Sequence, residues 1–220
     1  MPQQYSGVTD RQARQLCQQL RVQRIQTVSK TGGHLASSLG VVEILVAVHR
    51  VFDLDVDRLV FDVGHQCYAH KIITGRGSAM HTLRKFGGLS GFPKPYESRA
   101  DAFISGHASN SVSVALGMAR ARTVNGEDYS VLAFIGDGAL TGGLAYEGLA
   151  DAGNSGEPLI VILNDNGMSI TKNVGGVAAH LARQRLKPQY LHLKKLYRSM
   201  TGKNAVGQAV YRVTPGPRKW

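Results

Sequence analysis

The sequence predicts an α/β fold in which a parallel β-sheet lies between two layers of helices, making three layers in all. Two runs of consecutive apolar residues, 130–135 and 158–163, are typical of buried strands, and a helical segment over 140–152 separates them. A strand, a helix and a second strand in this order favour a parallel pair. Strands that are apolar along their whole length need helices on both faces of the sheet.

The rest of the chain supplies further elements of the same kind. Apolar residues at helical spacing predict helices, and a short β-branched run before Gly64 predicts another buried strand. Many Gly, Pro, Lys and Ser residues indicate an irregular connection. In chain order we expect a helix over 8–28, a helix over 38–52, a strand over 58–63, an irregular connection over 75–100 with a short helix near 79–85, a helix over 111–124, and helical structure in the last forty residues.

The composition fits one sizeable globular domain. The chain has 220 residues, of which 43% are hydrophobic, and no apolar run approaches the ~18–20 residues that a membrane span needs. The first ten residues lack the basic and then apolar layout of a secretory signal. Cys17 and Cys67 show neither metal-type nor redox-type spacing, which predicts free thiols and a cytoplasmic location.

The net charge of +11 is unevenly distributed along the chain. Residues 1–165 contain fifteen basic and fifteen acidic side chains, whereas eleven Lys or Arg and no acid follow Asp165. One interpretation is a surface for nucleic acid or a membrane. The other, which we favour because no aromatic residues or binding motif accompany the charge, is a surface whose acidic counterpart lies on another polypeptide or on a continuation of the chain.

Polar side chains follow both strong strands, at the end of the sheet where ligands bind in such folds. Asp137 lies between two glycines after the first strand, and Asn166 follows the second strand twenty-nine residues later. This separation allows one helix and one return strand, so the two side chains should lie on adjacent loops. Carboxylate and amide oxygens are ligands that Mg²⁺ prefers, with diphosphate oxygens completing its coordination. Flanking glycines and the following helix N-terminus would accommodate such an anion.

A dinucleotide-binding loop explains this glycine-rich turn less well. Gly136, Gly138 and Gly142 do not form the G-x-G-x-x-G pattern, since Thr141 occupies the third glycine position. An isolated Asp-Gly pair would most simply be an ordinary turn. The matching Asn166 and the flanking strands favour a metal site instead.

Six motifs in order narrow the interpretation. They are S-K-T-G-G-H-L-A-S-S-L-G at 29–40, F-D-V-G-H-Q-C-Y-A-H-K at 61–71, G-G-L-S-G-F-P at 87–93, G-H-A-S-N-S at 106–111, I-G-D-G-A-L-T-G-G at 135–143 and L-N-D-N-G-M-S-I at 163–170. Together they closely resemble the 1-deoxy-D-xylulose-5-phosphate synthase family of transketolase-like enzymes. The resemblance implies a thiamine diphosphate-binding domain of the diphosphate type over 1–213, with an unrelated coil over 214–220.

The resemblance also implies roles for individual residues. The implied metal ligands for magnesium are Asp137, Asn166 and the backbone carbonyl of Met168, beside which Gly167 stands where the family commonly has Glu. The implied cofactor-binding residues are His65, Gly106, His107, Ala108, Gly138, Ala139 and Asn166. His34 and His65 are the implied catalytic residues, His34 facing the substrate and assisting proton transfer, for which an imidazole is suited. On the residues alone, His34 could instead cap a helix, and His49 on its apolar helix is interpreted as structural.

In that family, pyruvate condenses with D-glyceraldehyde 3-phosphate and carbon dioxide is released, a step toward isoprenoid and thiamine precursors. The resemblance further implies a glutamate from a pyrimidine-binding domain that this chain does not reach. We therefore expect the chain to be inactive without a partner chain carrying the pyrimidine-binding and C-terminal domains, although a homodimer is also possible. The alternatives are an inactive truncated paralogue and, ranked last, a protein that binds nucleic acid through the basic residues 172–220.

Overall fold

The computed structural model describes Tyr5, residues 7–165 and Gly176. Its helices and strands, in chain order, are α1 (Asp10–Thr31), α2 (Ala36–Leu39), α3 (Val42–Val51), β1 (Arg58–Phe61), α4 (Tyr68–Lys71), the π-helical turn η1 (Ile72–Arg76), the 3₁₀ turn η2 (Ser78–Thr82), α5 (Ser111–Asn125), β2 (Val131–Gly136), the 3₁₀ turn η3 (Ala139–Thr141), α6 (Gly143–Ser155) and β3 (Ile160–Asn164). The expected helices in the last forty residues and the boundary at residue 213 lie outside this range.

The described strands form a parallel sheet in the order β1-β2-β3. Leu59 of β1 is in register with Leu132 of β2, and Ala133 of β2 is in register with Val161 of β3. All three carboxyl ends therefore lie at the same edge of the sheet. The parallel pairing predicted from the strand, helix and strand order is confirmed.

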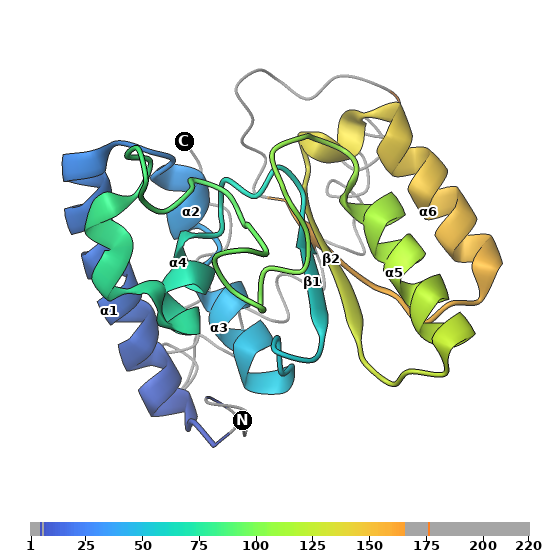
Figure 1. Ribbon diagram of the computed structural model, residues 1–220, viewed down its shortest axis with the longest axis horizontal. Helices are drawn as coiled ribbons and strands as arrows, with labels where there is room; N and C mark the ends of the chain where they lie inside the picture. Colours follow the sequence, from blue (N-terminus) through green and yellow to red (C-terminus); the bar gives the residue numbers. More distant parts are fainter. Residues whose placement is uncertain (1–4, 6, 166–175, 177–220) are drawn as a thin grey trace, which may run out of the picture. The chain divides into compact units, whose positions relative to one another are not determined.

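Helices cover both faces of this sheet (Figure 1), with α1, α3 and α4 on one side of β1 and β2 and with α5 and α6 on the other. Side chains alternate between the faces of a strand. One set belongs to the hydrophobic core formed with α1, α3 and α4, and its strand members are Leu59, Phe61, Leu132 and Phe134. On the other face α5 packs against β1 and β2, and α6 packs against α5. The three-layer α/β class is therefore confirmed.

Helix α1 has well-defined ends. At its start, the side chain of Thr9 accepts a hydrogen bond from the backbone N–H of Gln12, whose side chain accepts one from the N–H of Thr9. This reciprocal arrangement satisfies two N–H groups that the helix leaves unpaired. At its end, Gly32 has φ +71° and donates its N–H to the carbonyl of Val28.

Among the described residues, no helix has the length and apolar character needed to cross a membrane.

The local structure differs from the expectations at three places. The single helix predicted over 38–52 is two helices, because the chain leaves the helical conformation at Val41 (φ −113°, ψ 6°) after the weak helix former Gly40. The helix predicted from Leu140 begins at Gly143, after a 3₁₀ turn. The helical turns over 68–76 were not predicted, because their buried side chains include His70 and Lys71, which an apolar pattern does not place inside.

Candidate functional site

The polar residues that follow the strands gather at the carboxyl edge of the sheet. Asp62 follows β1, Asp137 follows β2, and Asp165 follows β3. The N–H of Asp137 donates to the carbonyl of Asn164 at 3.2 Å, so the loops after β2 and β3 are adjacent, as expected. The side chain of Asp137 is buried. The other two predicted metal ligands, Asn166 and Met168, lie outside the described residues, and within that range no group of three or more His, Cys, Asp or Glu forms a cation site.

Asp62 organises the loop that carries three of the predicted cofactor-binding residues. Its two carboxylate oxygens accept hydrogen bonds from the backbone N–H groups of Ser109 (2.8 Å) and Ser111 (3.0 Å), at the start of α5. A carboxylate at a helix N-terminus is favoured by the helix dipole. Asp62 was not predicted as a site residue, because the strand expected over 58–63 included it, whereas β1 ends at Phe61.

The loop over 106–108 is thereby held next to the loop after β2. The backbone N–H of Val63 donates to the carbonyl of His107 at 3.2 Å. The hydroxyl of Ser109 donates to the carbonyl of Ala139 at 2.7 Å. Two groups of predicted cofactor-binding residues, Gly106–Ala108 and Gly138–Ala139, therefore meet at one edge although about thirty positions separate them.

The backbone at this edge suits an anionic group. Helix α6 begins after Gly142 without a side-chain cap, so no side chain competes with a ligand for its first N–H groups. A side chain at Gly142 would lie 2.1 Å from the hydroxyl oxygen of Ser109, so only glycine allows this packing. Side chains at Gly136 or Gly106 would enter open space, and Gly106 has φ +150°. A diphosphate bridged to a cation on Asp137 fits this combination.

His34 and His65 come together beside this edge from different segments. His34 lies between α1 and α2, His65 lies after β1, and their rings meet edge to face with centroids 5.2 Å apart. Burial lowers the pKa of His34, and Arg84 lowers it further. The pKa of His65 is also lowered, by burial first and then by His34. The Nδ1 atom of His65 is buried with no hydrogen-bond partner among the described residues, so it can bond to a ligand.

Two residues that sequence reasoning missed support His34. The backbone N–H of His34 donates to the hydroxyl of the buried Tyr68 at 3.4 Å. A side chain at Gly33 would lie 2.7 Å from that hydroxyl, so Gly33 permits the contact. Arg84 brings a positive charge near His34. Neither contact has a sequence signal, because both join segments more than thirty residues apart.

Backbone strain is concentrated around the same residues. In the described part of the chain, three residues other than glycine have positive φ: Val63 (56°), Arg84 (62°) and Ser109 (72°). Val63 precedes the Gly64-His65 pair, Ser109 follows Ala108, and Arg84 lies near His34. Such conformations cost about 1–3 kcal/mol each and cluster at functional sites. Their grouping supports the location of the site independently of residue type.

Comparison with known proteins identifies the family. The profile described as 1-deoxy-D-xylulose-5-phosphate synthase matches residues 1–218. The chain belongs to this family. It is 52% identical over 207 residues to the synthase of Pelotomaculum thermopropionicum, covering 94% of this chain and 32% of that protein. It is 57% identical over 182 residues to the synthase of Clostridium kluyveri, covering 83% and 29%.

A third relative, 1-deoxy-D-xylulose-5-phosphate synthase 1 of Geobacter metallireducens, is 50% identical over 214 residues, covering 96% of this chain and 34% of that protein. The chain thus spans about a third of the length of these relatives. The resemblance inferred from the six motifs is confirmed at the level of the family.

The interpretation of His49 as a structural residue also agrees with the structure, since His49 is buried and its Nε2 lies 3.1 Å from Nδ1 of His70.

Proposed function

We propose that this chain is the part of a 1-deoxy-D-xylulose-5-phosphate synthase that binds the diphosphate of thiamine diphosphate through magnesium. The observation that carries the proposal is the meeting of Gly106–Ala108, Asp137–Ala139 and the His34–His65 pair at one edge of a parallel sheet, in a chain of this family. The proposed reaction of the whole enzyme joins pyruvate to D-glyceraldehyde 3-phosphate with loss of carbon dioxide.

Each residue group has a distinct proposed task. Asp137 holds magnesium together with Asn166 and the carbonyl of Met168, because hard oxygen ligands suit this ion. Gly138, Ala139 and the start of α6 receive the diphosphate, which the uncapped helix end supports. The loop over 106–108, fixed by Asp62, lines the cofactor.

When bound, thiamine diphosphate supplies an electron sink for the negative charge left as carbon dioxide departs. The protein supplies orientation and proton transfer. His65 offers the cofactor its Nδ1, which has no hydrogen-bond partner among the described residues. His34, whose pKa is lowered by burial and by Arg84, faces the substrate and assists proton transfer. Arg84 favours the binding of an anionic substrate next to it.

The relatives are about three times the length of the matched part, so we propose that turnover needs more than these residues. The pyrimidine-binding and C-terminal domains would come from a partner chain, with a second copy of the chain as the other possible associate. Until those domains are present, the site would bind the cofactor without activating it.

Isothermal titration calorimetry tests the binding proposal. Thiamine diphosphate should bind the purified chain in the presence of Mg²⁺, and Asp137→Ala should remove the Mg²⁺-dependent part of the affinity. The control is Asp151→Ala on α6, which removes an exposed ion pair with Arg120 of α5 and should leave binding unchanged. Equal affinity of the wild type and Asp137→Ala would overturn the metal assignment.

A reconstitution assay tests the need for further domains. The chain alone, given both substrates, thiamine diphosphate and magnesium, should form no product. Addition of the pyrimidine-binding and C-terminal domains of a family member should restore product formation, and the Asp137→Ala chain should fail to do so. Turnover by the chain alone would contradict this part of the proposal.

A further inference from the structure

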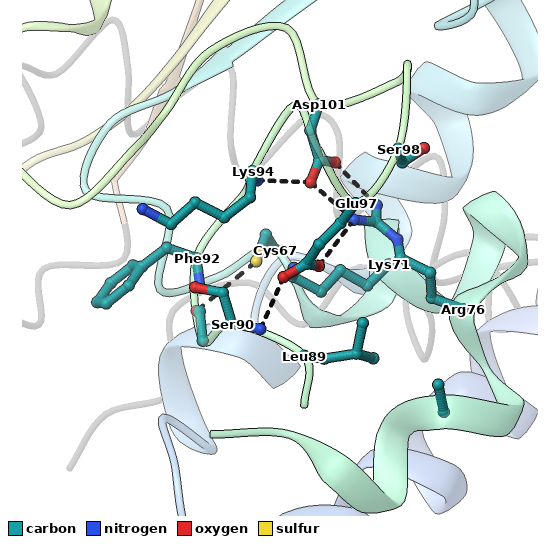
Figure 2. A network of polar contacts seen from close by, with 12 residues as sticks. Cys67, Lys71, Arg76, Leu89, Ser90, Phe92, Lys94, Glu97, Ser98 and Asp101 are labelled. Carbon is teal, nitrogen blue, oxygen red and sulfur yellow. Dashed lines mark hydrogen bonds and ion pairs between the residues drawn. The ribbon is translucent and has the colours of Figure 1, made fainter. Parts of the chain in front are cut away.

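A cluster of charged side chains is buried beneath the connection between η2 and α5. Lys71 and Arg76 come from the helical turns after β1, and Glu97 and Asp101 come from the connection itself. We call these four residues the anchoring cluster (Figure 2). The side chains of Lys71 and Asp101 are completely inaccessible to solvent, and those of Arg76 and Glu97 are 8% exposed.

Each carboxylate of the anchoring cluster binds both the helical turns and the backbone of the connection. Glu97 pairs with Lys71 and with Arg76 (3.3 Å) and accepts the backbone N–H of Ser90 at 2.7 Å. Asp101 receives two hydrogen bonds from Arg76 (2.7 and 2.8 Å) and one from the backbone N–H of Lys94 at 2.7 Å. It also pairs with Nε2 of His70 at 2.8 Å.

The two backbone contacts lie on either side of one short segment. Ser90 and Lys94 flank residues 91–93, so Glu97 holds one end of this segment and Asp101 holds the other (Figure 2). Within it, the ring of Phe92 lies 6.4 Å from the ring of His34, centroid to centroid.

The next residue in the segment, Pro93, packs against the backbone that precedes His65. A Cβ atom on Gly64 would lie only 2.5 Å from Cδ of Pro93. The carbonyl of Pro93 also accepts the N–H of Ser105 at 3.4 Å. Phe92 and Pro93 therefore contact the surroundings of both site histidines.

Burying four charges is costly, and an apolar cluster of similar shape would often be as stable. What the charged cluster provides is a defined geometry, because every carboxylate oxygen accepts a hydrogen bond from a particular donor. Burial alone would raise the pKa of Asp101, but hydrogen bonds from Arg76 and His70 outweigh it and hold the pKa below its usual range. The carboxylate therefore stays charged, and its contacts to the segment persist, at neutral pH.

We propose that Glu97 and Asp101 are positioning residues for the histidine site, acting through Phe92 and Pro93, which they hold against His34 and against the backbone before His65. The geometry of the anchoring cluster carries this inference. Its catalytic meaning rests on the proposed function, but the positioning itself does not require a cofactor.

The test is an NMR pH titration of the histidine Cε1–H resonances in the full chain, with His34→Gln and His65→Gln used for assignment. Glu97→Gln should loosen the segment, so the lowered pKa values of His34 and His65 should rise toward the ordinary value of ~6.5. Arg84 and Asp62, the other charged groups that influence the two histidines, are unchanged in this variant.

The matched control is Glu157→Gln, which breaks a similarly buried pair with Arg122. Glu157 precedes β3 and therefore lies at the amino end of this strand, whereas the site lies at the carboxyl ends of the strands. It should lower stability in urea while leaving both histidine titrations unchanged. A purely structural role for Glu97 predicts the same behaviour for both variants. Unchanged histidine titrations in Glu97→Gln would therefore overturn the proposal.

Phe92→Ala keeps the proposal testable if Glu97→Gln does not fold. Phe92 is half-buried and its ring takes no part in the hydrogen bonds of the anchoring cluster, so its truncation should leave the cluster intact. Because the cluster is proposed to act through this ring, Phe92→Ala should raise the pKa of His34 in the same direction. No change in the His34 resonance would refute the mechanism. Thiamine diphosphate binding is measured separately, so its failure would count against the proposed function and not against the positioning.

Discussion

Arg24 is a fully buried charge in the core between α1 and its neighbours. Its exposed fraction is zero, and none of its three guanidinium nitrogens has a hydrogen-bond partner among the described residues. Burial, and after it the positive charge of Arg21, lower the pKa of Arg24 to about 10. We predict that Arg24→Met, which keeps an unbranched side chain of similar length and removes the charge, stabilises the protein.

The magnitude follows from the pKa. The difference between the ordinary value of 12.5 and about 10 corresponds to a cost of about 3 kcal/mol for keeping Arg24 protonated in the fold. Imperfect packing of methionine in a space shaped by arginine costs about 1 kcal/mol. The net gain should be about 2 kcal/mol, or about 6 °C in Tm for a chain of this size. Below pH 10 Arg24 is protonated in both states, so the gain should be constant from pH 6 to 9.

Urea unfolding followed by circular dichroism measures this gain. The control is Arg11→Met, an exposed position on the same helix, which should change the free energy of unfolding by less than about 0.5 kcal/mol. A loss of stability in Arg24→Met, or no change, would show that the guanidinium has a compensating partner, and the reasoning from its burial would then be wrong.

Three further predictions concern buried groups. Asp62→Asn should lower the free energy of unfolding in urea by about 2 kcal/mol, because a neutral amide replaces a carboxylate that accepts two backbone N–H groups; an unchanged midpoint would contradict this. Burial raises the pKa of Cys67 to about 12, so neither Cys67 nor the buried Cys17 should react with a thiol reagent at pH 8 until urea unfolds the chain. Burial lowers the pKa of His49 to about 3, whereas the unfolded imidazole takes up a proton near 6.5, so stability should fall by about 2 kcal/mol between pH 6.5 and pH 5. His49→Gln should reduce that loss, and an equal loss in the variant would exclude His49 as its source.

The strands and the first candidate ligand could be predicted from the sequence because their signals are local. A run such as 130–135 is apolar at every position, which identifies β2 within one residue at each end. Asp137 follows that run after a single glycine, and the carboxyl ends of parallel strands meet at one edge. Periodicity and chain order are sufficient for both conclusions.

The anchoring cluster could not be predicted, because the local sequence around its four residues suggests exposed side chains, whereas the fold buries them. By composition Lys71 and Arg76 look like solvent-exposed residues of a short polar stretch, and Glu97 and Asp101 look like loop acids. The two basic residues can be buried only because the two acids pair with them, and the partners lie more than twenty residues apart in the chain. The helical turns over 68–76 were missed for the same reason, since their stability comes from these distant contacts and not from their own sequence.

The backbone strain at the site could not be predicted from the sequence either, and the contacts of Asp62 show why. Val63 and Ser109 both adopt positive φ, at a cost of about 1–3 kcal/mol each. Asp62 precedes the first, and its carboxylate accepts the N–H of the second and of Ser111. Charge-assisted hydrogen bonds of this kind contribute about 1.5–3 kcal/mol each, enough to offset the strain. The backbone that presents His65 and the loop over 106–108 is therefore held in a shape that neither segment would adopt alone, and the acid that directly follows β1 supports it.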